Sequence, residues 1–184
     1  MKVVLASSNP HKAEELARSL PGWEIGLLGT ELPPETGTTY YENARAKAEF
    51  GREVRPGEWI LGEDSGIEVA GLGGRPGVHS ARWAAEPVPA LLEALRGVAG
   101  EGRRARYVCE LVALGPGGEE RRGTGTLEGR IAEEPRGDEG FGYDPIFVPE
   151  GETQTVAELG NAWKAEHSHR ARAARALAGA LAGD

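Results

Sequence analysis

The stretch VVLASSNPHKAEEL, residues 3–16, decides how the fold begins, because an apolar run changes there into a helical pattern. Residues 3–6 are a short apolar run of the kind that fills a buried strand. Residues 7–9 are cap-type residues, and Pro10 suits a first helical position because its missing N–H would be unpaired there in any case. The sequence therefore predicts a strand that leads directly into a helix, whose apolar positions are Ala13, Leu16, Ala17 and Leu20.

The tip of this expected helix suits an anionic ligand. A strand that leads into a helix N-terminus exposes free backbone N–H groups and the positive end of the helix dipole. Ser7, Asn9 and Lys12 lie at the same tip and add polar and positive groups to it. We therefore expect these residues to bind a charged group such as a phosphate.

Length and composition are those of one ordinary globular domain. The chain has 184 residues, of which 39% are hydrophobic and 27% charged, and domains commonly run to roughly 100–200 residues. The sequence has no repeat and no linker, so we expect a single domain over residues 1–184. The apolar stretch after Lys2 is too short for a secretory signal, and no run is long enough to cross a bilayer, so we expect a cytoplasmic protein with no membrane partner.

The charge balance restricts the kind of ligand. A formal net charge of −8 argues against a nucleic-acid polymer, because binding a phosphate backbone requires a basic surface. A single anionic small molecule needs only a local cluster of Lys and Arg, assisted by a divalent cation. Cys109 is alone in the sequence, which excludes a disulfide framework within the chain, and its apolar neighbours predict a buried strand residue.

Strand and helix patterns along the rest of the chain predict an α/β protein with a mixed sheet. Strands are expected at residues 23–28, 104–114 and about 120–131, the last two as a hairpin around residues 115–118. Helices are expected from the capping box at residues 39–42 to about residue 53, over residues 87–95, and from about residue 168. The remaining segments predict a strand, an acidic turn and a strand over residues 58–71, irregular structure over residues 71–83, and a loop entering a short strand over residues 137–151.

Glu63, Asp64 and Ser65 form the expected acidic turn after an apolar strand. Adjacent carboxylates repel each other unless a cation or a cluster of donors holds them, so the pair suggests metal binding or general-base catalysis. A solvated turn is the alternative, because Asp-Ser-Gly is common turn chemistry. The residues alone leave both interpretations open.

Residues 141–145, FGYDP, place two aromatic side chains and a carboxylate in a glycine-flanked segment, where the backbone can approach a ligand closely. Phe141 is suited to stack on a flat base, an interaction of ~1–3 kcal/mol in nucleic-acid sites. Packing in the core beside a turn is the alternative for Phe141 and Tyr143.

Lys164, Ser168, His169 and Arg170 gather around the start of the last expected helix. Cap N–H groups, an imidazole and a guanidinium there suit the polar edges of a ligand. Zinc is not indicated, because His167 and His169 are two positions apart and diverge on a helix. The glycine-rich segments match neither a Walker nor a dinucleotide-binding pattern, and no G-x-S-x-G occurs.

Five segments together resemble the inosine/xanthosine triphosphate pyrophosphatase family, also called the Ham1-like family. They are SSNPHK, ETGTTYYENARAKA, GEDSGIEVAGLGGRPGVHSARW, FGYDPIF and KAEHSHR, in the family's order, and the resemblance runs from about residue 3 to residue 177. It implies an elongated mixed α/β fold with flanking helices, in which two lobes surround a central nucleotide-binding cleft, usually in a homodimer. It also implies Mg²⁺-dependent hydrolysis of the deaminated purine nucleotides ITP, dITP and XTP to the monophosphate and pyrophosphate.

The resemblance also implies roles for individual residues. Ser7, Asn9 and Lys12 match the triphosphate-binding segment, with Ser65 near a phosphate. Glu35, Glu63 and Asp64 are implied as Mg²⁺ ligands, Asp64 as the group that activates water, and Lys12 and Lys47 as stabilisers of the departing pyrophosphate. Nucleotide binding is implied for Phe141, Tyr143 and Asp144, and base recognition for Lys164, Ser168, His169 and Arg170. Ser7 stands where several relatives have Thr, and the hydroxyl is kept.

Two other functions are compatible with parts of this pattern. Maf-type pyrophosphatases also begin with a strand, a Ser-rich turn and a helix, although the SHR and FGYDP segments favour the purine family. A non-catalytic sensor of purine nucleotides would use the same binding residues, although Lys12, Glu35 and Asp64 argue for catalysis.

Overall fold

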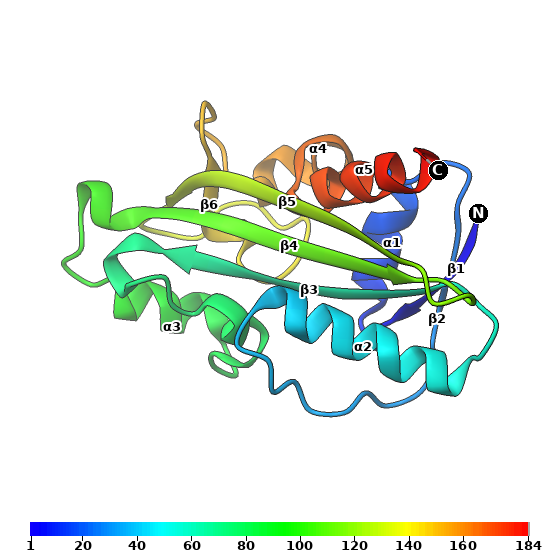
Figure 1. The fold of residues 1–184 in the computed structure, drawn as a ribbon. Helices are drawn as coiled ribbons and strands as arrows, with labels where there is room; N and C mark the ends of the chain where they lie inside the picture. The colour runs from blue at the N-terminus through cyan, green and yellow to red at the C-terminus, as the bar shows by residue number, and fades with distance from the viewer. Residues whose placement is uncertain (184) are drawn as a thin grey trace. The chain divides into compact units, whose positions relative to one another are not determined.

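The computed structural model describes residues 1–183 and contains a six-stranded sheet in the order β2-β1-β3-β4-β5-β6 (Figure 1). Strand β1 is parallel to β2 and β3, whereas β5 and β6 are antiparallel, which confirms the expected mixed sheet with flanking helices. The strands are β1 Lys2–Ala6, β2 Glu24–Leu27, β3 Ile60–Val69, β4 Arg104–Leu114, β5 Glu120–Ile131 and β6 Phe147–Pro149. The α-helices are α1 Pro10–Ser19, α2 Tyr40–Val54, α3 Pro87–Ala94, α4 Val156–His167 and α5 His169–Ala182.

The chain divides into two compact units. Unit 1 contains Met1–Asp64, Cys109–Gly125 and the segment from His169 onward, and unit 2 contains Ser65–Val108 and Thr126–Ser168. Strands β3, β4 and β5 each contribute residues to both units. The expected single domain, and the expected cleft between two lobes, stay predictions. No described helix is long and apolar enough to cross a membrane.

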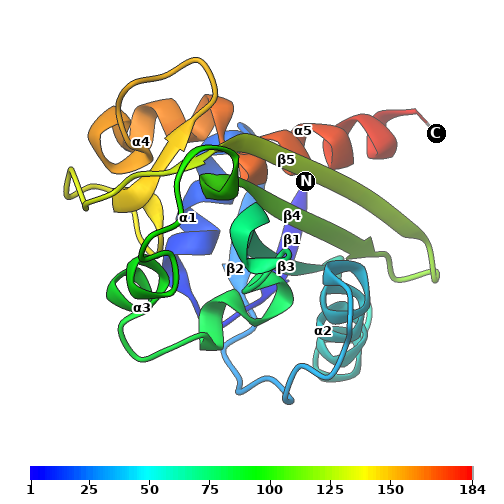
Figure 2. The same cartoon turned by 90° about the vertical axis from the view of Figure 1, so that its left-hand side faces the viewer.

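Unit 1 is a layer of strands between helices. Successive side chains of β1 point to opposite faces, so Val4 joins an apolar cluster with α2 while Leu5 joins one with α1 and α5. Figures 1 and 2 show α2 on one face of these strands and α5 on the other. Cys109 is fully buried in the second cluster, as its apolar neighbours predict.

Unit 2 has an apolar core of its own. Side chains of β3, β4, β5 and α3 pack there with the segment that leads into β6. In the helix expected at residues 87–95, Leu91 and Leu95 are buried in this core and Leu92 is partly buried against it. Tyr143, Ile146 and Phe147 belong to the same core, so three of the seven residues of the FGYDPIF segment are held by packing.

The predicted helix starts are confirmed in atomic detail. Asn9 caps α1, with its side chain accepting a hydrogen bond from the His11 N–H, and Pro10 occupies the first turn. Both hydrogen bonds of the predicted capping box are present between Thr39 and Glu42 at the start of α2. In α1, however, the predicted apolar position Ala17 is exposed and Glu15 is buried.

Two sequence predictions are wrong. The expected acidic turn is the middle of β3, a continuous strand, and its carboxylates are buried and paired rather than solvated. Helix α4 was not expected at all, because the sequence pattern places the last helix near residue 168. Its helical pattern is interrupted at Gly160, whose φ of 84° is accessible to glycine at little cost.

The close approach of β3 and α2 generates a stability prediction. A Cβ atom at Gly62 would overlap the backbone carbonyl of Ala44, which cannot move without shifting α2. We expect Gly62→Ala to lower the free energy of unfolding by about 1–3 kcal/mol, measured by urea denaturation. Gly26→Ala is the matched control, because a Cβ atom on that β2 glycine has no neighbour within 4 Å. Equal stability of the two variants would contradict this packing.

Candidate active site

Strand pairing brings the tip of α1 beside the acidic pair of β3. Ala6 at the end of β1 lies opposite Gly62 of β3, so the turn that follows β1 begins beside Glu63 and Asp64. Ser7 Oγ accepts a hydrogen bond from Asn9 N at 3.1 Å, and the Asn9 side chain caps the helix. These two predicted phosphate ligands therefore shape the turn, and the helix N-terminus carries the positive end of its dipole.

Glu63 is the centre of a buried group of charges in unit 1. Its side chain is fully buried, and Lys12 Nζ lies 2.5 Å from Oε2. Arg170 donates to Oε1 from Nη2 at 2.9 Å and from Nε at 3.3 Å. Burial raises the pKa of Glu63, but the charges of Lys12, Arg170 and Lys47 outweigh it and hold the pKa well below its ordinary value.

These contacts give Glu63 a different role from the implied one. The resemblance implies that Glu63 binds metal, yet both carboxylate oxygens are committed to cationic side chains. The Glu63 side chain is also fully buried, whereas those of Glu35 and Asp64 are 18% and 5% exposed, so the metal role of Glu63 has less support than that of the other two carboxylates. Glu63 instead fixes Lys12 at the tip of α1.

Arg170 is also placed differently from the expectation that it reads a base. Only 2% of the residue is exposed, and its guanidinium is paired with Glu63 and with Glu15 of α1. A buried guanidinium needs opposite charge close to it, which explains why the site uses Glu15. Sequence reasoning missed Glu15, although its position three residues after Lys12 places both side chains on one helix face.

Asp64 belongs to a second set of contacts, centred on Lys47. Lys47 Nζ lies 3.1 Å from Asp64 Oδ1 and 2.9 Å from the Glu63 carbonyl oxygen, and it pairs with Glu35. The Asn43 side chain donates to Asp64 Oδ2 at 3.0 Å. The structure therefore brings together three residues expected in one site, Lys47, Glu35 and Asp64, and it adds Asn43, which was not expected from the sequence.

Burial and neighbouring charges shift the pKa values of Asp64 and Lys47. Burial raises the pKa of Asp64, and this effect exceeds the opposing influence of Lys47 and Asn43. Burial lowers the pKa of Lys47, but the carboxylates of Asp64, Glu63 and Glu35 raise it by more. The pKa therefore lies above its ordinary value, and Lys47 stays charged. A carboxylate with a raised pKa is a better proton acceptor than an ordinary aspartate, which suits general-base catalysis.

Glu35 and Asp64 fit a magnesium ion. Both carboxylates already converge on one cation, the Lys47 ammonium, and carboxylate oxygen is the donor that Mg²⁺ prefers in proteins. Within residues 1–183, no group of three His, Cys, Asp or Glu side chains is arranged to hold a metal. This donor set matches the usual mode of Mg²⁺, which keeps several waters and binds one or two carboxylates together with substrate phosphates.

A recognition cluster in unit 2 joins Phe141, Asp144 and Lys164. Asp144 Oδ2 accepts from the Phe141 N–H at 2.9 Å and from Lys164 Nζ at 2.7 Å. Lys164 Nζ lies 4.5 Å from the centroid of the Phe141 ring. These three predicted residues, separate in the sequence, therefore form one group with an aromatic face and a cation beside it.

Four predicted site residues remain, Tyr143, Ser65, Ser168 and His169. Tyr143 is buried in the core, its hydroxyl donates to the Ser80 carbonyl at 3.0 Å, and burial raises its pKa to about 12. Tyr143 thus follows the packing interpretation. Ser65 is half-buried in β3, Ser168 ends α4 in unit 2, and His169 begins α5 in unit 1.

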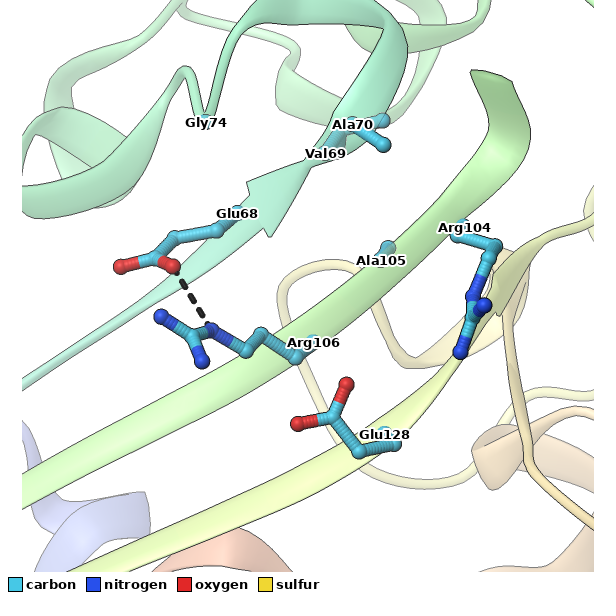
Figure 3. Close-up of a pocket in the computed structure, with 8 residues that line it drawn as sticks. All are labelled: Glu68, Val69, Ala70, Gly74, Arg104, Ala105, Arg106 and Glu128. Atoms are coloured by element: carbon cyan, nitrogen blue, oxygen red, sulfur yellow. Dashed lines mark hydrogen bonds and ion pairs between the residues drawn. The ribbon is translucent and has the colours of Figure 1, made fainter. Parts of the chain in front are cut away.

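A separate cavity in unit 2 contains none of the predicted site residues. It has a volume of about 200 Å³ and opens beside the ion pair of Arg106 and Glu68, whose Nε and Oε2 are 2.8 Å apart (Figure 3). Arg104 and Glu128 also line it. The contacts around Lys47 and those around Asp144 are not part of its lining.

The buried pair of Arg170 and Glu15 generates a stability prediction. Glu15→Gln removes one of the two carboxylates that compensate the buried guanidinium, and we expect a loss of about 3 kcal/mol in the free energy of unfolding. Glu14→Gln on the same helix is the control, because that side chain is 59% exposed and should change stability by less than about 0.5 kcal/mol. Chemical denaturation measures both, and a Glu15→Gln protein as stable as the control would show that this charge is dispensable.

Comparisons with known proteins give a single answer. The Ham1 family model matches residues 3–180. A dITP/XTP pyrophosphatase from Bdellovibrio bacteriovorus is 43% identical over 190 residues, covering 96% of this chain and 96% of that protein. A dITP/XTP pyrophosphatase from Thermus thermophilus is 45% identical over 188 residues, covering 96% of this chain and 90% of that protein.

The fold agrees with solved structures. A HAM1 protein from Coxiella burnetii superposes with a TM-score of 0.87 at 34% identity, covering all of both chains. The Staphylococcus aureus Ham1 protein gives a TM-score of 0.85 at the same identity, over 100% of this chain and 99% of that one. With sequence and fold both matched over almost the whole length, this chain belongs to the Ham1 family.

Proposed function

We propose that this protein is a nucleoside-triphosphate pyrophosphatase that converts the deaminated purine nucleotides ITP, dITP and XTP to the monophosphate and pyrophosphate. The observation that carries the proposal is the set of contacts among Asp64, Lys47 and Glu35, which combines a buried base with a cation. The relatives named dITP/XTP pyrophosphatase, at 43% and 45% identity, support the substrate class. These relatives favour the deaminated purine substrates over a Maf-type activity.

Lys12 and Lys47 neutralise the phosphates in this proposal. Phosphoryl transfer needs positioning and charge neutralisation more than covalent help from the protein. The Lys12 side chain is 17% exposed, so part of it remains accessible at the tip of α1, where free backbone N–H groups also face an anion. Lys47 stabilises the charge that develops on the departing pyrophosphate.

Asp64 acts as the base that prepares the attacking water. It accepts a proton from water as the oxygen forms a bond to the α-phosphorus, and the bond from that phosphorus to the bridging oxygen breaks to release pyrophosphate. The pKa of Asp64, raised by burial, favours proton acceptance. Asn43 and Lys47 hold the carboxylate in one orientation for this step.

We propose Mg²⁺ as the cofactor, held by Glu35 and Asp64. When bound, Mg²⁺ supplies positive charge to the phosphate oxygens and lowers the repulsion between substrate and carboxylates. Lys47 contacts the same two carboxylates and is therefore placed to share their charge with the ion.

The recognition cluster of unit 2 reads the base. Phe141 provides an aromatic face for stacking, and the Lys164 ammonium beside it is a donor. Hypoxanthine and xanthine carry an oxygen at C6 that accepts from such a donor, whereas adenine presents an amino group and leaves it unpaired. An unpaired buried donor costs about 1–3 kcal/mol, which favours the deaminated bases.

We also propose that the enzyme works as a homodimer in the cytoplasm. The resemblance to the family supports the homodimer, and a nucleotide pool supplies the substrate in that compartment. Purine nucleoside triphosphates are its partners, and the net charge of −8 speaks against a nucleic-acid polymer.

Pyrophosphate release from ITP, measured with Mg²⁺ and with EDTA, tests the function. We expect release only with the metal, and faster release from ITP, dITP and XTP than from ATP or dTTP. Tight binding of ITP without release would identify a nucleotide sensor instead. A preference for dTTP or another pyrimidine nucleotide would favour the Maf-type alternative.

Replacing Asp64 tests the base directly. Asp64→Asn keeps the shape of the side chain and removes its ability to accept the proton, so we expect turnover of ITP to fall at least about 100-fold. Glu53→Gln, a carboxylate-to-amide change at an exposed position of α2, should keep the wild-type rate. Circular dichroism and thermal melting verify that both variants fold, and a near-normal rate for Asp64→Asn would remove this residue from the role.

A further inference from the structure

We propose that Tyr107 is a positioning residue for base recognition, acting through Asp144 on Phe141 and Lys164. This inference rests on the proposed function, because it concerns the residues that read the base there. Tyr107 lies on β4 and carries no motif that distinguishes it from an ordinary core residue in the sequence. The inference follows from the hydrogen bond that its hydroxyl donates to Asp144.

The Asp144 carboxylate is held from three segments of unit 2. Tyr107 Oη donates to Asp144 Oδ1 at 3.2 Å. The other oxygen, Oδ2, accepts from the Phe141 N–H at 2.9 Å and from Lys164 Nζ at 2.7 Å. Because Tyr107 holds one oxygen, the carboxylate cannot rotate freely, and the second oxygen stays directed at the backbone of Phe141 and the ammonium of Lys164.

Tyr107 is a firm anchor because packing fixes its ring. Only 7% of the residue is exposed, and its ring lies 4.6 Å from the Phe147 ring, tilted by 45°. The Phe147 ring is fully buried in the apolar core of unit 2. The position of the hydroxyl is thus set by a strand and a core, whereas Phe141 lies in a loop.

The recognition cluster has little room to rearrange around Asp144. A Cβ atom at Gly140 would contact both the Asp144 carboxylate and Lys164 Nζ, so loop backbone, carboxylate and ammonium are closely packed. Small rotations of the carboxylate therefore displace the Lys164 donor relative to the Phe141 ring. A donor displaced in this way binds a 6-oxo group less well, while the contacts around Asp64 that serve the chemical step are unchanged.

Tyr107→Phe is the test, because it removes one oxygen atom and keeps the packing against Phe147. We expect the KM for ITP to rise about tenfold, the size expected for losing a hydrogen bond to a charged group, with kcat within about twofold of wild type. The preference for ITP over ATP, as the ratio of kcat/KM values, should fall by a similar factor. A purely structural role would lower the melting temperature and leave KM and this preference unmoved.

Tyr41→Phe is the matched control. Tyr41 also donates its hydroxyl to a carboxylate, Glu120 Oε1 at 2.7 Å, but it belongs to α2 in unit 1 and has no part in recognition. The same chemical change there should leave KM, kcat and the preference at wild-type values. A Tyr107→Phe enzyme that matches this control, or that loses kcat with an unchanged KM, overturns the inference.

Binding of the product separates this inference from the proposed function. Calorimetric titration with IMP and with AMP reports base recognition without any chemical step. If the wild-type protein releases no pyrophosphate but binds IMP better than AMP, the hydrolytic function fails, and weaker IMP binding by Tyr107→Phe still supports the positioning role. Equal IMP affinity of wild type and Tyr107→Phe overturns that role whatever the catalytic result.

Discussion

Unit 1 depends on the compensation of one buried carboxylate, that of Glu63. A charge removed from water is costly unless opposite charges and hydrogen bonds replace the solvent, and Glu63 obtains both from Lys12 and Arg170. The three residues come from β3, α1 and α5, so satisfying this charge requires one strand and both helices to converge. Glu15 extends the arrangement, because Arg170 would otherwise carry its charge against a single partner.

The proposed function gives chemistry and base recognition to two sets of contacts that share no residue. Asp64, Lys47 and Glu35 hold one another in unit 1, and Phe141, Asp144 and Lys164 do so in unit 2. Each set has an anchor of its own, Asn43 for the first and Tyr107 for the second.

Local rules predicted much of the fold and failed where charge is buried. Capping residues correctly predicted where α1 and α2 begin, after the N-caps Asn9 and Thr39, because those signals act within one turn. They failed at β3, because adjacent carboxylates usually indicate a solvated turn. Here partners that are distant in the sequence neutralise the carboxylates, and this makes a buried strand possible. The buried ion pairs of Arg170 could not be predicted for the same reason, because its partners Glu15 and Glu63 are distant in the sequence. No signal in the sequence indicates the hydrogen bond of Tyr107, because the acceptor, Asp144, is 37 residues away.

The continuous course of β3 has a consequence for how such an enzyme can evolve. Asp64 lies in the middle of β3, an interior strand of the sheet, and its side chain is buried, so few substitutions there are compatible with the packing. Phe141 is carried by a loop, where sequence drift is tolerated far better. In the proposed function, a new nucleobase preference can therefore arise from substitutions of Phe141 while the residues of the hydrolytic step are kept.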